Sequence, residues 1–145
     1  MRRVMMKPRR GASIKALTPL PPGYALSRFT PEIFAAHPFE HGANYRDYED
    51  FMRCGSGMAV LRESSVVAAA SSFLSFGSDV ELDVFTAPEH RRKGLADHCV
   101  AAMMDDCAAR GLTVHWDAQN DMSAAMAQSH GFAVAQDYAV YVLKS

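Results

Sequence analysis

The chain has 145 residues, of which 49% are hydrophobic and 21% are charged, and its formal net charge at pH 7 is -1. This length and composition fit one soluble globular domain and exclude collagen-like, coiled-coil and wholly disordered proteins. No apolar run is long enough to span a bilayer, and the basic N-terminus is not followed by the apolar stretch of a secretory signal. The three cysteines include no C-x-x-C pair, which favours reduced thiols and a cytoplasmic protein.

The first fifteen residues carry a charge imbalance that the net charge hides. All six charged residues there are basic, whereas the remaining residues hold nine basic and sixteen acidic side chains. A basic arm can bind nucleic acid or anionic lipid, but an acidic body does not suit a polyphosphate backbone. We therefore expect residues 1–22, which end in a proline-rich stretch, to be a basic, disordered or extended lead-in. We expect no nucleic-acid partner and no membrane contact.

Residues 23–145 are expected to form a single domain, and its first half contains two helices among strands. A helix begins after Thr30 because this residue is a good N-cap and Pro31 suits the first helical turn. The period of the apolar residues then changes from helical to alternating, which predicts a three-stranded antiparallel meander. The expected order is strand, helix, helix, strand, strand, strand, over residues 24–29, 31–36, 44–53, 58–62, 66–76 and 79–86.

The second half alternates strands and helices. Its long helix has an apolar stripe that includes Leu95, Cys99 and Met103, and it ends at Gly111. The expected elements are a loop, a helix, a strand, a helix and two final strands, over residues 87–93, 94–110, 112–117, 120–130, 132–135 and 138–143. The whole pattern predicts an α+β domain with a mixed sheet.

The junction between the strand over 79–86 and the long helix has the features of an anion site. The strand is followed by a proline, a basic turn and Gly94, and then by the helix. The first turn of a helix has free N–H groups and a partial positive charge, and a glycine lets a ligand approach the backbone. This combination favours a phosphate or pyrophosphate, although an ordinary loop with solvated basic residues remains the alternative.

Two sequence blocks resemble the GNAT acetyltransferase superfamily. Arg91-x-x-Gly94-x-Ala96 matches its R/Q-x-x-G-x-G/A signature. The block Asn120-x-x-Ser123-x-x-Met126-Ala127-x-x-x-Gly131-Phe132 is similar to the N-x-x-A-x-x-L-Y-x-x-x-G-F block of the same proteins. The chain looks most like a bacterial subgroup known only as GNAT acetyltransferases. The resemblance implies a GNAT-like fold, in which a mostly antiparallel central sheet is splayed at the acyl-CoA site and has helices on both faces.

The resemblance implies acetyl-CoA, or another acyl-coenzyme A, as the cofactor. Backbone groups of Val84 and Thr86 would pair with the pantetheine arm, and amides of the loop after them would hold the pyrophosphate. Asn120 would reach the pantetheine arm, with a helix-capping role as an equal alternative. Ser123 would hydrogen-bond the cofactor, although a serine in the first helical turn is often only a cap. The implied cofactor-binding residues are Val84, Phe85, Thr86, Arg91, Arg92, Lys93, Gly94, Leu95, Ala96, Asn120 and Ser123.

The implied reaction is an N-acyltransferase reaction in which a neutral amine attacks the thioester directly. A general base must first take the proton of the ammonium substrate. Glu81 is the first candidate and Asp83 the second, and either is otherwise a solvated or positioning carboxylate; His115 is a further candidate. The family's usual acid tyrosine falls on Ala127, so Tyr138, Tyr141 or water would protonate the leaving thiolate.

The sequence leaves alternatives for the acceptor substrate and for the oligomeric state. A small-molecule amine or a protein amine is expected, with Tyr45 or Tyr48 either reaching it or packing in the core, and a homodimer is an open alternative. A module that binds acyl-CoA as a sensor, or binds a protein partner, without catalysis is the second reading. No metal is expected, because Pro38 breaks any helix between His37 and His41.

Overall fold

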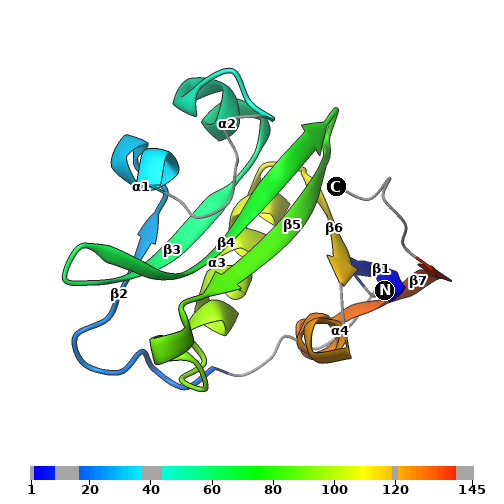
Figure 1. Ribbon diagram of the computed structural model, residues 1–145. Helices are drawn as coiled ribbons and strands as arrows, with labels where there is room; N and C mark the ends of the chain where they lie inside the picture. The colour runs from blue at the N-terminus through cyan, green and yellow to red at the C-terminus, as the bar shows by residue number, and fades with distance from the viewer. Residues whose placement is uncertain (1, 9–16, 37–43, 119–120, 140–145) are drawn as a thin grey trace.

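A computed structural model describes residues 2–8, 17–36, 44–118 and 121–139. Its centre is a seven-stranded mixed sheet with the strand order β2-β3-β4-β5-β6-β1-β7 (Figure 1). Helices cover both of its faces, which confirms the expected α+β architecture with a mixed sheet. Within these residues no helix is long and apolar enough to cross a membrane.

The first half of the domain contains the predicted strand and two helices. They are β2 (Ala25–Arg28), α1 (Pro31–Ala36) and α2 (Tyr48–Cys54). Thr30 caps α1 as predicted, since its hydroxyl oxygen accepts from the N–H of Ile33 at 3.2 Å. The second helix was predicted to begin at residue 44 and begins later, because the Asp47 carboxylate accepts from the N–H of Asp50 at 2.8 Å and so caps the helix there.

The predicted meander is present as β3 (Gly57–Arg62), β4 (Ser65–Phe76) and β5 (Asp79–Thr86). The turn between β3 and β4 has only two residues, Glu63 and Ser64, both with positive φ angles (50° and 71°). Such turns match the twist of a tight hairpin. After β5 come a short 3-10 helix, η2 (Pro88–His90), and the long helix α3 (Leu95–Ala109).

The chain then returns through β6 (Thr113–Ala118), α4 (Asp121–Ser129) and β7 (Phe132–Ala139). The sequence predicted two final strands, over 132–135 and 138–143, and the predicted break between them is wrong. One continuous strand replaces them, because Gln136 and Asp137 pair with β1 and so carry the ladder across the expected break. Residues 140–143 lie outside the described residues.

The predicted lead-in requires a correction at β1 (Arg2–Pro8). This strand pairs antiparallel with β6 through Val4↔Ala118 and with β7 through Val4↔Asp137. It therefore lies inside the sheet, between two strands from the far end of the chain. Further along the lead-in, Leu20 packs against the main core and the Thr18 carbonyl lies 2.7 Å from the His98 ring. Much of the expected tail is thus part of the domain.

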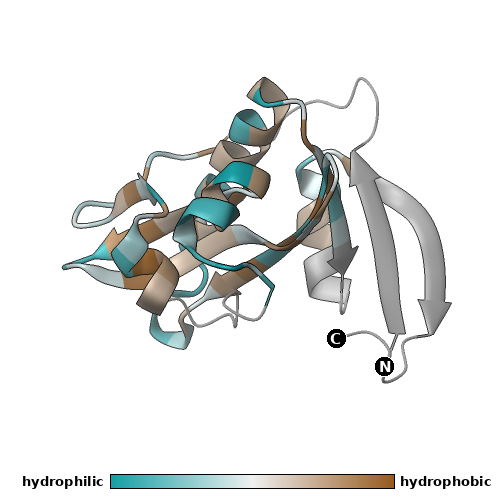
Figure 2. Ribbon diagram, turned by 90° about the horizontal axis from the view of Figure 1, so that it is seen from above, coloured by the Kyte–Doolittle hydropathy of each residue, from teal (hydrophilic) through white to brown (hydrophobic). Residues whose placement is uncertain are grey.

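Two hydrophobic cores lie on opposite faces of the sheet. The larger joins α3 and α4 to the sheet, with Trp116 and Phe132 in edge-to-face contact at a centroid distance of 5.5 Å. The smaller joins α1 and α2 to the sheet around Phe29 and Phe51. Figure 2 shows hydrophobic residues along the central strands and hydrophilic residues on the outer turns of α3. The two faces of β5 consequently meet different environments.

A partly exposed ion-pair cluster around Asp106 holds α3 against the neighbouring elements. Asp106 accepts from Arg110 at 2.9 Å, from Arg28 at 3.0 Å and from the Ser56 hydroxyl at 2.8 Å. Burial alone would raise the pKa of the Asp106 carboxyl, but these hydrogen bonds hold it below its ordinary value. Arg110 also donates to the Gly55 carbonyl at 2.7 Å. Tied in this way at its C-terminal end, α3 presents its N-terminus at the opposite edge of the molecule.

Candidate cofactor site

The sheet opens between β5 and β6. The two strands run parallel and pair from Asp79↔Thr113 to Leu82↔Trp116. Beyond Leu82, β5 continues to Thr86 with no partner on this side among the described strands. Figure 1 shows the two strands separating toward their C-terminal ends. The expected splay is therefore present in the structure.

Backbone groups of β5 point into this opening. The N–H of Ala87 donates to the Val67 carbonyl of β4 at 2.8 Å. Because bonding positions alternate along an antiparallel pair, Phe85 and Asp83 also face β4. The N–H and C=O groups of Val84 and Thr86 consequently face the open side. This is the arrangement that an added strand requires.

The turn after β5 prepares a second group of donors. Arg92 and Gly94 both have positive φ angles, 64° and 72°, and Gly94 is the residue that precedes α3. Among the described residues no side chain caps this helix end, and the first N–H groups of a helix are suited to an anion. A left-handed backbone at a non-glycine residue such as Arg92 costs about 1 kcal/mol or more, and such strain gathers at functional sites.

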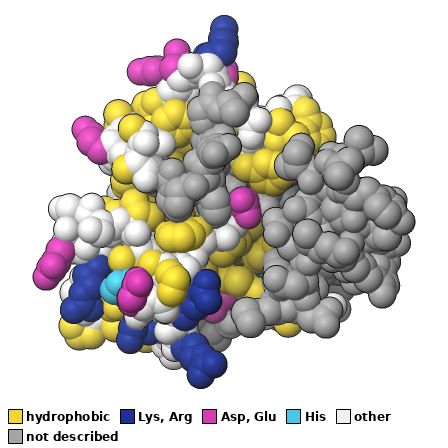
Figure 3. All heavy atoms as spheres, in the orientation of Figure 1, with side chains coloured by type: hydrophobic (Ala, Val, Ile, Leu, Met, Phe, Trp, Pro, Cys, Tyr) yellow, Lys and Arg dark blue, Asp and Glu magenta, His cyan; other side chains and the backbone are white. Residues whose placement is uncertain are grey.

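The opening and the turn line a single cleft of about 760 Å³. Its described walls include Trp116 from β6 and Met126 from α4, neither of which was predicted as a cofactor-binding residue. Figure 3 shows Lys and Arg side chains gathered with a histidine at the lower left, where Figure 1 places the turn between β5 and α3. The predicted residues that the cleft brings together are Val84, Thr86, Arg91, Arg92, Lys93, Gly94, Leu95 and Ala96.

Three contacts brace the rim of the cleft. His90 hydrogen-bonds to the Tyr24 hydroxyl at 2.9 Å, and the Arg62 guanidinium lies 4.9 Å from the centre of the Tyr24 ring. On the other side, the His130 ring lies 2.7 Å from the Asp97 carboxylate and links α4 to the first turn of α3. The Asp97 carboxylate, in the first turn of α3, is therefore paired with His130, which directly follows α4.

Several predicted residues are not part of this lining. Phe85 lies on the other face of β5, where it lines a second pocket. Asn120 lies outside the described residues, and Ser123 lies in α4 with its side chain outside them. Ala127, which the family pattern placed at the acid position, is 0% exposed inside the core, and its neighbour Met126 lines the cleft instead. The helix turns the two adjacent positions to different surroundings, which the sequence block alone did not show.

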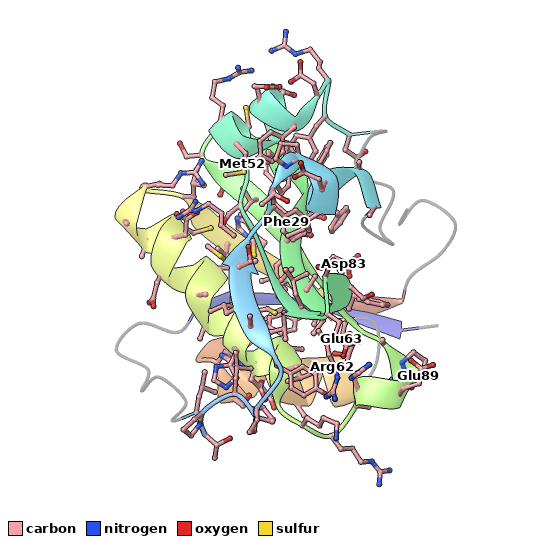
Figure 4. All side chains as sticks on the ribbon, turned by 90° about the vertical axis from the view of Figure 1, so that its left-hand side faces the viewer. Phe29, Met52, Arg62, Glu63, Asp83 and Glu89 are labelled. Carbon is pink, nitrogen blue, oxygen red and sulfur yellow. The ribbon has the colours of Figure 1, made fainter. Side chains whose placement is uncertain are left out.

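The candidate bases lie on the face of β5 opposite the cleft. Asp83 accepts from the N–H of Val84 at 3.0 Å, so its carboxylate sits at the edge of the opening. In Figure 4, α3 lies on one side of the sheet and Asp83 and α1 lie on the other. Glu81 is one step back, opposite His115 in the parallel register. The His115 ring lies 2.8 Å from the Asp79 carboxylate and stacks near Phe76, so it has structural partners.

The tyrosines considered for the site have other partners or lie farther away. The Tyr45 hydroxyl contacts Ser72 and Ser75 in the core, and burial raises its pKa. The Tyr48 hydroxyl donates to the Phe29 carbonyl at 2.8 Å. Tyr138 lies in β7, two strands beyond β6, which places its backbone roughly 10 Å from the β6 edge of the cleft. Its side chain and all of Tyr141 are outside the described residues.

The mixed sheet with its opened strand edge has the architecture expected of the acetyltransferase family, and comparison with known proteins identifies that family. A profile of the GNAT acetyltransferase family matches residues 1–141, and the chain belongs to this family. It is 32% identical over 136 residues to a Bacillus subtilis (strain 168) protein named uncharacterized N-acetyltransferase YdfB. That match covers 89% of this chain and 52% of the relative, so the chain spans about half the length of that protein.

Solved structures show the same fold. A GCN5-related N-acetyltransferase-like protein from Streptococcus suis 89/1591 superposes with a TM-score of 0.77 at 26% identity, over 94% of this chain and 59% of the other. The aminoglycoside N-acetyltransferase AAC(6')-Iy, solved in complex with CoA, superposes with a TM-score of 0.59 at 17% identity. That match covers 81% of this chain and 97% of the other, and it concerns the fold alone.

Proposed function

We propose that the cleft binds an acyl-coenzyme A, with acetyl-CoA as the expected form, and that the protein transfers the acyl group to a primary amine. The observation that carries this proposal is the opening of β5 from β6 beside the uncapped start of α3. The backbone groups of Val84 and Thr86 then suit the amides of a pantetheine arm, while Gly94 and the basic turn suit a pyrophosphate. A cleft of about 760 Å³ is large enough for such a ligand.

The chemistry that acetyl-CoA supplies when bound is an acyl group held as a thioester. The amine nitrogen attacks the carbonyl carbon, so a C–N bond forms, the C–S bond breaks and CoA departs as a thiolate. The Val84 N–H is placed to donate to the developing oxyanion. This donor is occupied by Asp83 in the structure, so the thioester oxygen would replace the carboxylate there.

Asp83 suits the role of general base better than Glu81. A carboxylate displaced from the Val84 N–H remains at the opening and gains the capacity to take a proton from the attacking ammonium group. Glu81 lies one alternation farther from the opened part of β5. No tyrosine is among the described residues that line the cleft. We therefore assign protonation of the thiolate to water, and a thiol is a good enough leaving group for this.

The proposal also covers the class of acceptor and the cellular compartment. The proposed acceptor is a small-molecule amine or a protein amine. The described chain has three free cysteines, two of them buried, and burial raises the pKa of Cys99 to about 12. Inert buried thiols of this kind suit the reducing cytoplasm.

The test is an acetyl-transfer assay with the purified protein, acetyl-CoA and a panel of primary amines. Thiol release and the mass of the amine product are both measured, because hydrolysis alone also releases thiol. Transfer that disappears in the Gly94→Glu variant supports the proposal, since the new side chain enters the phosphate space with a like charge. Tight CoA binding with no acylation of any amine would favour the second reading, an acyl-CoA sensor. Absence of CoA binding would refute both.

A further inference from the structure

A second pocket lies on the face of β5 opposite the cofactor cleft. It has a volume of about 480 Å³. One wall is α1, and the other is the turn between β3 and β4 together with the first residues of β4. Phe85 forms the side toward the sheet. The described residues that line it are Glu32, Ile33, Ala36, Ser64, Ser65, Val66 and Phe85.

The lining defines the chemistry of a ligand. Ile33, Val66 and Phe85 give the pocket an apolar interior, and Ile33 is only 7% exposed. Glu32 is exposed and is the one carboxylate among the described lining residues. Pockets of a few hundred cubic ångströms with an apolar lining and few polar groups are typical of small-molecule sites. A compact apolar body carrying one positive charge fits these features better than a polycation does.

The pocket and the cofactor cleft lie on the two faces of the same segment of β5. Val84 and Thr86 line the cofactor cleft, whereas Phe85, between them, lines the pocket. Asp83 is on the same face as Phe85, about 7 Å away along the strand. Because β6 has separated from β5 here, a group on one face can reach an acyl group held at the open edge. Asp83 lies at this edge, at the Val84 N–H.

We propose that this pocket holds the acceptor, and that the acceptor is a compact primary amine with an apolar alkyl or aryl body. The amino group points along Phe85 toward Asp83, where it loses its proton before it attacks. This inference rests on the proposed function and adds to it the location and the substrate class. Glu32 at the rim favours the cationic form of the incoming amine.

The experiment fills the pocket from α1. Ala36→Trp places a large ring at a lining position, and Ala35→Trp is the matched control, because Ala35 is also exposed on α1 and is not among the residues that line the pocket. Transfer is measured with 2-phenylethylamine and 3-methylbutylamine, and with spermidine and a lysine-containing peptide for comparison. Binding of 2-phenylethylamine is measured separately by saturation-transfer NMR, and CoA binding by calorimetry.

The inference predicts that the two apolar amines are the better acceptors. Ala36→Trp should lower their kcat/KM by about tenfold or more and abolish the NMR signal, with CoA affinity unchanged, while Ala35→Trp behaves as the wild type. Preferred transfer to spermidine or to the peptide, or transfer indifferent to Ala36→Trp, would overturn it while leaving the proposed function intact. If no amine is acylated, the proposed function fails; 2-phenylethylamine binding that only Ala36→Trp removes would then keep the pocket as a ligand site and refute its acceptor role.

Discussion

Replacing Gly94 by alanine separates the cost of backbone strain from the cost of blocking the cofactor cleft. Gly94 has a φ of 72° and has nothing within 4 Å of an added Cβ, and the same is true of Gly111 after α3. A left-handed backbone costs a non-glycine residue about 1–2 kcal/mol, and the lost flexibility of the unfolded chain offsets about 0.4–1 kcal/mol of this. Each variant should therefore lose about 1 kcal/mol of unfolding free energy.

The two variants should differ in CoA affinity. Only Gly94 lines the cleft, so only Gly94→Ala puts a methyl group where the pyrophosphate is expected to approach the backbone. We expect its CoA dissociation constant to rise by about tenfold or more, equivalent to about 1.4 kcal/mol, whereas Gly111→Ala keeps the wild-type value. Denaturant unfolding and calorimetric titration measure the two effects. Equal CoA affinities in the two variants would refute the assignment of the phosphate site.

Four further predictions concern the base, the sheet, the core and the pH dependence. Asp83→Asn should lower turnover by about 10²–10⁴ without weakening CoA binding, and Glu81→Gln by less than about tenfold; the reverse order in steady-state assays would move the base to Glu81. Deletion of residues 2–8 should lower the free energy of unfolding by roughly 4 kcal/mol or more, because β1 joins β7 to β6. Denaturant unfolding measures this, and wild-type stability would show that β1 is dispensable. Ala127→Tyr should destabilise the fold by about 1–3 kcal/mol rather than speed transfer, since Ala127 is buried, and a faster, equally stable enzyme would contradict this. The pKa of Asp106 lies below its ordinary value of 3.8, so its stabilisation is complete above about pH 5 and is lost as the pH falls through the lowered pKa. Asp106→Asn should therefore flatten the fall in unfolding free energy from about pH 5 to about pH 3, and an unchanged slope would refute this.

Local signals predicted the cofactor turn and most of the elements. Thr30 and Pro31 mark the start of α1, and the alternation in 79–86 identifies both β5 and its two faces. The glycine and the basic residues before α3 predicted an uncapped helix start beside a strand end, which the structure contains. Each of these features depends on residues that are close together in the sequence.

The errors arose where partners are distant in the sequence. The N-terminal strand looked like a tail because its basic residues and prolines are typical of solvent-exposed segments, and its ladder depends on β6 and β7, more than 100 residues away. The same pairing joins the two expected C-terminal strands into one. The surroundings of Ala127 depend on how α4 packs against β6 and β7, which a family block does not specify.

Amide hydrogen exchange with and without CoA tests the central claim most directly. If CoA lies along the open edge of β5 and against the start of α3, the N–H groups of Val84 and Thr86 and those of residues 92–96 should exchange more slowly in its presence. The paired amides of β3 serve as the internal control and should be unaffected. Protection confined to these two segments is the predicted result. Saturating CoA that leaves both segments unprotected, or protects a different part of the chain, would contradict the account.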